Sequence, residues 1–231
     1  MSPTLSIVIP AYNEERFIGT LLRQIKAVDL AQLGIEKEII VVDDCSRDGT
    51  PAVVAAEPGV TLHRMATNGG KGRAVRAGIG RATGDYLIIQ DADLEYDPND
   101  YIPMLRVLLE GRADTVYGSR YMVSGKHPNQ SWMAYLGGRS LSLVALAFTG
   151  RYLTDTVTAL KLFRRSDVAS LPLETNGFET DHEITARLLA RGARIVEVPI
   201  GYSPRSREEG KKIGPRDWFI GFRTLWRYRN G

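Results

Sequence analysis

Short apolar runs alternate with helical patterns through the first hundred residues, and this alternation constrains the fold more than any other feature of the chain. Four runs rich in aliphatic residues, bounded by Gly, Pro, Asn or Asp, predict buried strands at 5–9, 38–42, 60–64 and 86–90. Apolar residues on one face predict a helix from near Glu14, and further helices follow at 50–56 and 71–82. Such a chain forms an α/β fold with a mainly parallel central sheet flanked by helices.

The second half of the chain is less regular. Strands are expected at 114–117, 159–163 and 193–200, and helices at 133–148 and 179–191. No internal repeat, low-complexity tract or break in composition marks a linker, so we expect one domain over residues 1–204. Residues 205–231 then form an appendage, in which a basic loop precedes an amphipathic helix.

The net charge of +3 is concentrated at the C-terminus. Residues 205–231 carry eight of the 30 basic residues and three of the 27 acidic ones, so residues 1–204 have a net charge of −2. Basic residues confined to one end, rather than spread over a face with stacking aromatics, argue against a nucleic-acid-binding protein.

The sequence also bears on where the protein acts. A single cysteine, Cys45, cannot form an internal disulfide, and the N-terminus lacks the pattern of a secretory signal. No apolar run approaches the roughly 20 residues that span a bilayer. We therefore expect a cytoplasmic protein, or one that lies peripherally on the cytoplasmic face of a membrane.

Four polar motifs follow predicted strands, at the edge where a parallel sheet binds its ligands. They are Pro10-Ala11-Tyr12-Asn13-Glu14, Val42-Asp43-Asp44, Asn68-Gly69-Gly70-Lys71-Gly72-Arg73-Ala74 and Asp91-Ala92-Asp93. The glycine-rich motif offers backbone amides and two cations, which suits phosphate, although it matches neither the P-loop nor the dinucleotide fingerprint. Asp91 and Asp93 concentrate negative charge where a hard divalent cation would bridge them to phosphate oxygens.

Together these motifs resemble glycosyltransferase family 2 enzymes of the GT-A fold, particularly the branch that transfers sugars to dolichyl or polyprenyl phosphate. The resemblance rests on the order and joint presence of SIVIPAYNEE, VVDDCSRDGT, NGGKGRAVRAGI, GDYLIIQDADLEYDP, VYGSRY, LKLFRR, GFETDHEI and PRSREEGKKIG. It implies a metal-dependent transfer of a hexose from a nucleotide sugar, GDP-mannose or UDP-glucose, to the lipid phosphate. It also implies a nucleotide-binding half over about 1–120 and an acceptor half over about 121–204.

The resemblance implies a nucleotide-sugar site made of these residues: Pro10, Tyr12, Glu14, Asp44, Gly70, Lys71, Gln90, Asp91, Ala92, Arg207 and Lys212. Within this set, Asp44 would hold the base or its ribose. Asp91 and Asp93 would bind Mg²⁺ or Mn²⁺ together with the donor diphosphate. Gln90 would contact the nucleotide or the hydration shell of the metal.

On the acceptor side, the resemblance implies two arginines that hold the lipid phosphate. Arg120 stands in the Gly-Ser-Arg-Tyr string of the branch, and Arg139 is the candidate for the second arginine. A phosphate nucleophile is already an anion and needs little or no general base, so positioning and charge compensation would supply the catalysis. An acceptor hydroxyl would instead need a carboxylate base, for which Asp181 is the first candidate and Asp155 the second.

The C-terminal segment carries two further predictions. Its loop resembles a basic family loop that closes over the donor diphosphate, with Arg207 and Lys212 at matching spacing. In the helix that follows, apolar residues from Trp218 to Trp226 fall on one face beside three arginines, a pattern that suits either a lipid interface or packing on the catalytic domain. We keep both alternatives, and with them a separate membrane subunit that would anchor the chain.

Two other functions stay as alternatives. A family 2 glycosyltransferase can act on a polysaccharide or a small-molecule acceptor, and a chain of this fold can bind a nucleotide sugar without turnover. The acidic residues Asp44, Asp91 and Asp93 argue against the second of these alternatives.

Overall fold

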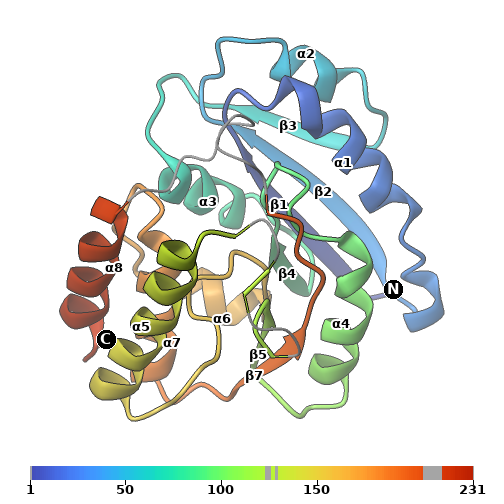
Figure 1. Cartoon of the computed structure of the whole chain (residues 1–231). Helices are drawn as coiled ribbons and strands as arrows, with labels where there is room; N and C mark the ends of the chain where they lie inside the picture. The colour runs from blue at the N-terminus through green and yellow to red at the C-terminus, as the bar shows by residue number, and fades with distance from the viewer. Residues whose placement is uncertain (1, 123–125, 128–129, 205–214, 231) are drawn as a thin grey trace.

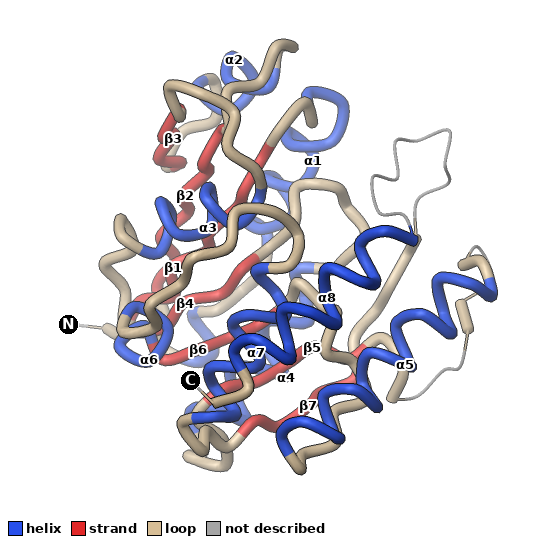
Figure 2. Tube along the Cα trace, turned by 90° about the vertical axis from the view of Figure 1, so that its left-hand side faces the viewer, coloured by secondary structure: helices blue, strands red, loops and turns tan. Residues whose placement is uncertain are grey.

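The computed structural model describes residues 2–122, 126–127, 130–204 and 215–230. Within these residues, seven strands form one sheet in the order β3-β2-β1-β4-β6-β5-β7 (Figures 1 and 2). The strands are β1 (Thr4–Ala11), β2 (Glu36–Asp43), β3 (Val60–Arg64), β4 (Tyr86–Ile89), β5 (Thr115–Ser119), β6 (Lys161–Arg164) and β7 (Ile195–Pro199). The α-helices are α1 (Glu15–Ala27), α2 (Thr50–Ala55), α3 (Lys71–Ile79), α4 (Tyr101–Leu109), α5 (Trp132–Thr149), α6 (Arg165–Ala169), α7 (Thr180–Ala190) and α8 (Pro215–Tyr228), with short 3₁₀ helices η1 (Ala31–Leu33) and η2 (Pro98–Asp100).

The sheet is parallel except at β6. Strand β1 pairs in parallel with β2 and β4, β2 with β3, and β5 with β7, whereas β6 runs antiparallel between β4 and β5. The predicted α/β fold with a mainly parallel central sheet is therefore confirmed. Because β6 runs in the opposite direction, the segment before β6 lies at the same edge of the sheet as the segments that follow the other strands.

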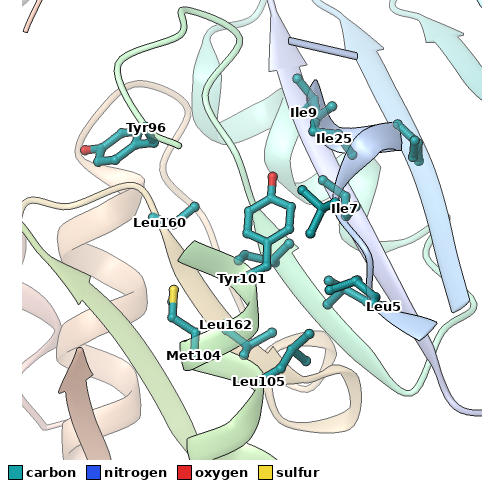
Figure 3. Close-up of a cluster of buried hydrophobic side chains, with 14 of the residues drawn as sticks. Leu5, Ile7, Ile9, Ile25, Tyr96, Tyr101, Met104, Leu105, Leu160 and Leu162 are labelled. Carbon is teal, nitrogen blue, oxygen red and sulfur yellow. The ribbon is translucent and has the colours of Figure 1, made fainter. Parts of the chain in front are cut away.

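Both faces of the sheet are buried, as expected for parallel strands linked by helices. Along β1, Leu5, Ile7 and Ile9 belong to a core cluster shared with α1 and α4, part of which is shown in Figure 3. Val8, between them, belongs to a second cluster shared with α3 and α7 on the opposite face. The alternation of side chains along one strand thus joins two helical layers.

A third layer is formed by α5, α7 and α8. Its core includes Leu141 of α5, Ala186 of α7 and Leu225 of α8, and α5 lies beside α8 in both views (Figures 1 and 2). The apolar stripe predicted for the C-terminal helix is divided between two environments, since Leu225 is buried while Phe219 is 69% and Trp226 52% exposed. Among the described residues, no helix combines the length and apolarity required to cross a bilayer.

The sequence analysis did not assign α4, although this helix packs Tyr101, Met104 and Leu105 into the first cluster. Pro103 interrupts the helical pattern in the sequence, but it lies in the first turn of α4, where proline displaces no helical hydrogen bond. The other predicted elements differ from the structure by a few residues at their ends. For example, the helix predicted over 71–82 ends at Ile79.

Candidate active site

A cavity of about 630 Å³ opens at the carboxyl edge of the sheet, walled by the segments that follow β1, β2, β4 and β5 and by parts of α3, α5, α7 and α8. Eleven predicted site residues line it: Pro10, Tyr12, Glu14, Asp44, Gly70, Lys71, Asp91, Ala92, Asp93, Arg120 and Asp181. Gln90 and Arg139 are not part of its lining. Arg207 and Lys212 lie outside the described residues.

The segments after β1 and β2 are bonded to each other. The backbone amide of Asn13 donates to Ser46 Oγ at 2.9 Å, and the amide of Glu14 donates to Thr50 Oγ1 at 2.9 Å. In return, the Asn13 side-chain oxygen accepts from the amide of Arg47 at 2.9 Å. Asn13 has φ 55°, a left-handed conformation that asparagine tolerates well. These crossed bonds fix the backbone on which Tyr12 and Glu14 face the cavity.

Four backbone amides of the glycine-rich segment bond to acceptors elsewhere in the chain. The Asp44 carboxylate accepts from the amides of Gly69 at 2.8 Å and Gly70 at 2.7 Å. The amides of Gly72 and Arg73 donate instead to the backbone oxygen of Asn176, at 2.7 and 3.3 Å. Acceptors distant in the chain thus engage these four amides, and phosphate binding by this segment stays a prediction.

Glycine is required in this segment for a different reason. Gly70 has φ +91°, and a Cβ there would lie 2.5 Å from the backbone oxygen of Asn176. The close approach of the two backbones excludes a side chain. The group that this segment presents to the cavity is the ammonium of Lys71.

Lys71 sits between two carboxylates. Its Nζ lies 2.8 Å from Asp91 Oδ1 and 3.1 Å from Asp181 Oδ2, and its side chain is 9% exposed. The other oxygen of Asp181 lies 3.3 Å from the Nζ of Lys161, a lysine of β6 that is fully buried. Four charged side chains from β6, α3, α7 and the segment after β4 therefore form a continuous chain of ion pairs.

Burial alone would raise the pKa of the Asp181 carboxyl, but the ammonium groups of Lys161 and Lys71 outweigh burial and lower it below its ordinary value. Both oxygens of Asp181 also face an ammonium. A carboxylate in this state accepts a proton poorly, so the site opposes the role of general base that an acceptor hydroxyl would require of it.

Asp91 and Asp93 have the ligand chemistry that Mg²⁺ and Mn²⁺ prefer, because both are hard oxygen donors on one wall of the cavity. Burial raises the pKa of Asp91; Lys71 opposes this rise, and Asp93 and Asp181 add to it. Within the described residues, no three His, Cys, Asp or Glu side chains group to hold a metal ion unaided. The two aspartates therefore fit a cation that takes its remaining oxygens from a diphosphate and water.

Gln90 does not reach the cavity and is fully buried. Its Oε1 accepts from the hydroxyl of Tyr101 at 2.8 Å, and its Nε2 donates to the backbone oxygen of Asp91 at 3.0 Å. Its amide group is thus bonded to α4 and to the segment after β4, and it is not part of the cavity lining. Gln90 instead braces the segment that carries Asp91.

Arg120 faces the cavity with a carboxylate behind it. Its Nε and Nη2 donate to the two oxygens of Asp155 at 2.6 and 2.8 Å, and Asp155 is only 1% exposed. The guanidinium carbon lies 5.3 Å from the centre of the Tyr121 ring and 5.0 Å from that of Tyr202. This bidentate, aromatic-flanked geometry is typical of an arginine held in place to bind an anion.

Arg139 is near this group but is not part of the cavity wall. Its Nη1 donates to the backbone oxygen of Thr154 at 2.9 Å and its Nη2 to the hydroxyl of Tyr152 at 2.7 Å. Its guanidinium carbon lies 5.9 Å from the Tyr121 ring, which Arg120 also contacts. The structure thus brings both predicted arginines to one tyrosine while directing only Arg120 into the cavity.

Other residues of the cavity wall were not predicted from the sequence, and three of them are polar side chains of interest: Glu95, His182 and Tyr202. Glu95 and Tyr202 are joined by a hydrogen bond of 2.9 Å from the tyrosine hydroxyl, a contact between residues more than a hundred positions apart. The position of Glu95, two residues after Asp93, was the available signal. His182 stands near the start of α7, next to the predicted site residue Asp181.

His182 is buried beneath α8. A Cβ on Gly221 would lie 2.7 Å from its Nε2, so the helix approaches the imidazole closely. Among the described residues, Nδ1 of His182 finds no hydrogen-bond partner. Burial lowers the pKa of His182 to about 4, so the imidazole is neutral at physiological pH.

Comparison with known proteins adds to this geometry. The chain is 29% identical over 221 residues to the low-salt glycan biosynthesis hexosyltransferase Agl6 of Haloferax volcanii, covering 94% of this chain and 52% of that protein. It is 32% identical over 216 residues to the dolichol-phosphate mannosyltransferase of Pyrococcus furiosus, covering 91% of this chain and 59% of that protein. The chain therefore spans between half and three fifths of the length of these two relatives.

Among solved structures, the fold is similar to glucosyl-3-phosphoglycerate synthase from Mycobacterium tuberculosis, a structure that contains Mn²⁺, UDP and glucosyl-3-phosphoglycerate. The TM-score is 0.74 at 21% identity, covering 98% of this chain and 80% of that chain. The family model described as glycosyl transferase family 2 matches residues 6–171. The chain belongs to glycosyl transferase family 2.

Proposed function

We propose that this protein transfers a hexose from a nucleotide sugar to the phosphate of a polyprenyl or dolichyl carrier lipid, with Mg²⁺ or Mn²⁺ as cofactor. GDP-mannose and UDP-glucose are the two donors we favour. The relatives named as hexosyltransferase and dolichol-phosphate mannosyltransferase support the reaction class. The arrangement of acids and cations around the cavity supports the choice of acceptor.

The observation that carries this choice is that both candidate general bases are already engaged. Asp181 is held by Lys71 and Lys161, and Asp155 is held by Arg120. An acceptor hydroxyl needs a base that can take its proton, whereas a phosphate is an anion and needs none. The pairing of these two acids with buried cations, together with the presence of Arg120 on the cavity wall, therefore favours a phosphate acceptor.

On the donor side, we assign the nucleotide to the wall formed by Pro10, Tyr12, Glu14 and Asp44. Because Asp44 accepts two loop amides, it both shapes the glycine-rich segment and borders the nucleotide. Lys71 is placed to meet the diphosphate, since it lies on the cavity wall beside Asp91.

The metal would be held by Asp91 and Asp93, and when bound it would neutralise charge on the departing diphosphate. The other steps fall to residues of the chain. Arg120 holds the acceptor phosphate, whose oxygen attacks the anomeric carbon as the bond between that carbon and the diphosphate oxygen breaks. No proton moves in this step, and the nucleoside diphosphate leaves beside Lys71.

We also propose that the protein works at a lipid surface. Several large apolar side chains of α5 and α8 are exposed, and Met133, Phe219 and Ile220 among them also line the cavity. The exposed apolar surface therefore continues into the cavity mouth beside α8. This continuity would let a lipid chain remain in the membrane while its phosphate reaches Arg120.

The function is tested in two stages on the full chain. First, calorimetry measures the binding of UDP, GDP, UDP-glucose and GDP-mannose with Mn²⁺, with Mg²⁺ and with EDTA. Second, the donor that binds is labelled in its sugar and incubated with undecaprenyl phosphate, undecaprenol or 3-phosphoglycerate in detergent. We expect metal-dependent binding of one nucleotide class and transfer to undecaprenyl phosphate alone.

Each stage has an outcome that contradicts the proposal. Absence of binding to all four nucleotides would remove the proposed donor site, and nucleotide binding without transfer to any acceptor would favour a chain without turnover. Transfer to undecaprenol would mean that a hydroxyl is accepted, and transfer to 3-phosphoglycerate would replace the lipid by a small phosphorylated acceptor.

A further inference from the structure

One turn, Thr154-Asp155, is bonded to both predicted acceptor arginines. The Asp155 carboxylate accepts from Nε and Nη2 of Arg120 and also from its backbone amide, at 3.1 Å. The neighbouring backbone oxygen, that of Thr154, accepts from Nη1 of Arg139. The position of this turn therefore sets where both guanidinium groups lie.

The turn is itself held by Glu197 of β7. Glu197 Oε2 accepts from the backbone amide of Thr154 at 2.7 Å, and Oε1 accepts from the Thr154 hydroxyl and the Asp155 amide, each at 2.8 Å. The Thr154 hydroxyl is also hydrogen-bonded to Ser119 Oγ at 2.6 Å. One carboxylate thus receives three donors from two consecutive residues.

Glu197 is well placed to act at a distance from the ligand. It does not line the cavity, and neither do Thr154 and Asp155. It is paired in register with Tyr117 of β5, the strand that ends in Ser119 directly before Arg120. The strand pair β5 and β7 therefore carries both Arg120 and the acid that fixes its counter-ion.

We propose that Glu197 is a positioning residue for the acceptor: by holding the Thr154-Asp155 turn, it fixes the guanidinium of Arg120 in the orientation that binds the acceptor phosphate. This inference rests on the proposed function, in which Arg120 holds that phosphate. An arginine side chain has several rotatable bonds, and a bidentate partner fixes it only if the partner itself is fixed. Five hydrogen bonds meet this condition. Three join Glu197 to the Thr154-Asp155 turn, and two join the Asp155 carboxylate to Arg120.

The test compares Glu197→Gln with Asp114→Asn. Glutamine keeps the size of the side chain but replaces one acceptor oxygen by an amide donor, which would face a donor of the turn. Asp114 is the matched control, because it pairs with Arg194 at 2.8 Å at the other end of the same strand pair and lies outside the cavity lining. Both variants alter an acid at the β5–β7 strand pair, but only Glu197 is linked by hydrogen bonds, through Asp155, to Arg120.

The probes are farnesyl phosphate and farnesol, titrated into the full chain, and the nucleotide that the wild type binds, titrated with Mn²⁺. In Glu197→Gln we expect the Kd of farnesyl phosphate to rise about tenfold or more, the effect of misplacing a binding group by a fraction of an ångström. Nucleotide Kd should stay within about twofold, and Asp114→Asn should change neither value by more than that. Thr154→Val, which removes only the hydroxyl bonds, should give a smaller loss in the same direction.

Several results would overturn the inference. If Glu197→Gln binds farnesyl phosphate as tightly as the wild type, Glu197 does not position the arginine. If nucleotide and farnesyl phosphate affinities fall together, its role is general stability. Should Glu197→Gln fail to fold, the affinities of Thr154→Val for farnesyl phosphate and for the nucleotide test the inference in the same way. Equal binding of farnesol and farnesyl phosphate by the wild type would instead show that the phosphate is not recognised, which removes the proposed function together with the inference.

Discussion

The walls proposed for the donor and for the acceptor present their ion pairs to the cavity in different ways. On the proposed donor wall, both members of the pair Asp91 and Lys71 line the cavity, and the carboxylate is the more exposed, at 25% against 9% for the lysine. On the proposed acceptor wall, Arg120 lines the cavity, whereas its partner Asp155 is buried outside the lining. An exposed carboxylate suits a ligand that arrives with a cation, and an arginine whose partner is hidden suits a bare anion. The position of the carboxylate, rather than the presence of an ion pair, distinguishes the two walls.

The largest effect is expected on the donor wall. Asp93→Asn removes one of two carboxylates proposed to hold the metal, so metal-dependent nucleotide binding should be lost and sugar transfer should fall about 1,000-fold. Calorimetry with and without Mn²⁺ measures the first effect, and labelled-sugar transfer measures the second. Asp97→Asn is the control, because Asp97 accepts from the Asn99 amide at 2.9 Å and is not part of the cavity lining. Unchanged nucleotide binding in Asp93→Asn would contradict the assignment of the donor wall.

A substitution of Arg120 in the acceptor wall should lower the stability of the protein as well as its binding of farnesyl phosphate. Arg120→Met leaves Asp155 buried without its partner, which should lower the free energy of unfolding by about 3 kcal/mol. Adding Asp155→Asn removes the unpaired charge, so the double variant should recover part of the stability but none of the farnesyl phosphate binding. Urea denaturation measures the first quantity. If the double variant is no more stable than Arg120→Met, the unpaired charge of Asp155 is not the cause of the lost stability.

Because the imidazole of His182 beneath α8 is neutral, we expect the stability of the protein to depend on pH. The pKa of His182 is lowered to about 4 in the folded chain, against 6.5 for an ordinary histidine. Between these values the unfolded chain binds the additional proton, so the contribution of His182 to stability is present above pH 6.5 and is lost as the pH falls towards 4. The slope is at most about 1.4 kcal/mol per pH unit.

His182→Gln should remove most of this slope when the free energy of unfolding is measured by urea titration from pH 7 to pH 4. His63→Gln is the comparison, since burial and Arg81 lower the pKa of His63 in the same direction, but His63 lies on the edge strand β3, away from the cavity. A slope that persists in His182→Gln would mean that the imidazole is already protonated, or accessible to water, in the folded protein.

The smallest effect on stability is expected at the apolar surface of α8. Phe219→Ser and Trp226→Ser alter exposed side chains and should each change the free energy of unfolding by less than about 0.5 kcal/mol. Binding to anionic phospholipid vesicles should nevertheless fall about fivefold for each, the equivalent of losing about 1 kcal/mol of apolar burial. Leu109→Ser at the end of α4 is the control for an exposed apolar side chain elsewhere. If all three variants bind the vesicles equally well in a flotation assay, the proposed lipid surface is contradicted.

The donor wall was largely predictable from sequence, because its chemistry follows directly after parallel strands. Asp44 and Asp91 each stand within two residues of a buried strand, and strands of one parallel sheet bring such residues to one edge. The hydrogen bonds of the loop amides could not be predicted, because their acceptors are distant in the chain. The burial of Gln90 could not be predicted for a similar reason: its partner Tyr101 belongs to a helix that the sequence pattern did not reveal.

The acceptor wall depends on contacts that no local pattern encodes. Asp155 lies 35 positions from Arg120, and Glu197 lies a further 42 or 43 positions from the turn that it holds. A resemblance to known motifs identified Arg120, but only the fold shows which acid stands behind it. The buried position of Asp155 depends on the placement of β6 between β4 and β5, which no local pattern predicts.

The opposite edge of the sheet offers a place for a reporter group. Strands β3 and β5 begin there, after turns in which Gly59 and Gly111 have positive φ and open space around them. Arg112, next to one of these glycines, has an exposed side chain paired only locally with Glu110. A fluorescent dye on Arg112→Cys, in a chain that also carries Cys45→Ser, would thus stand across the sheet from the cavity, where it could follow donor and acceptor binding without competing for either.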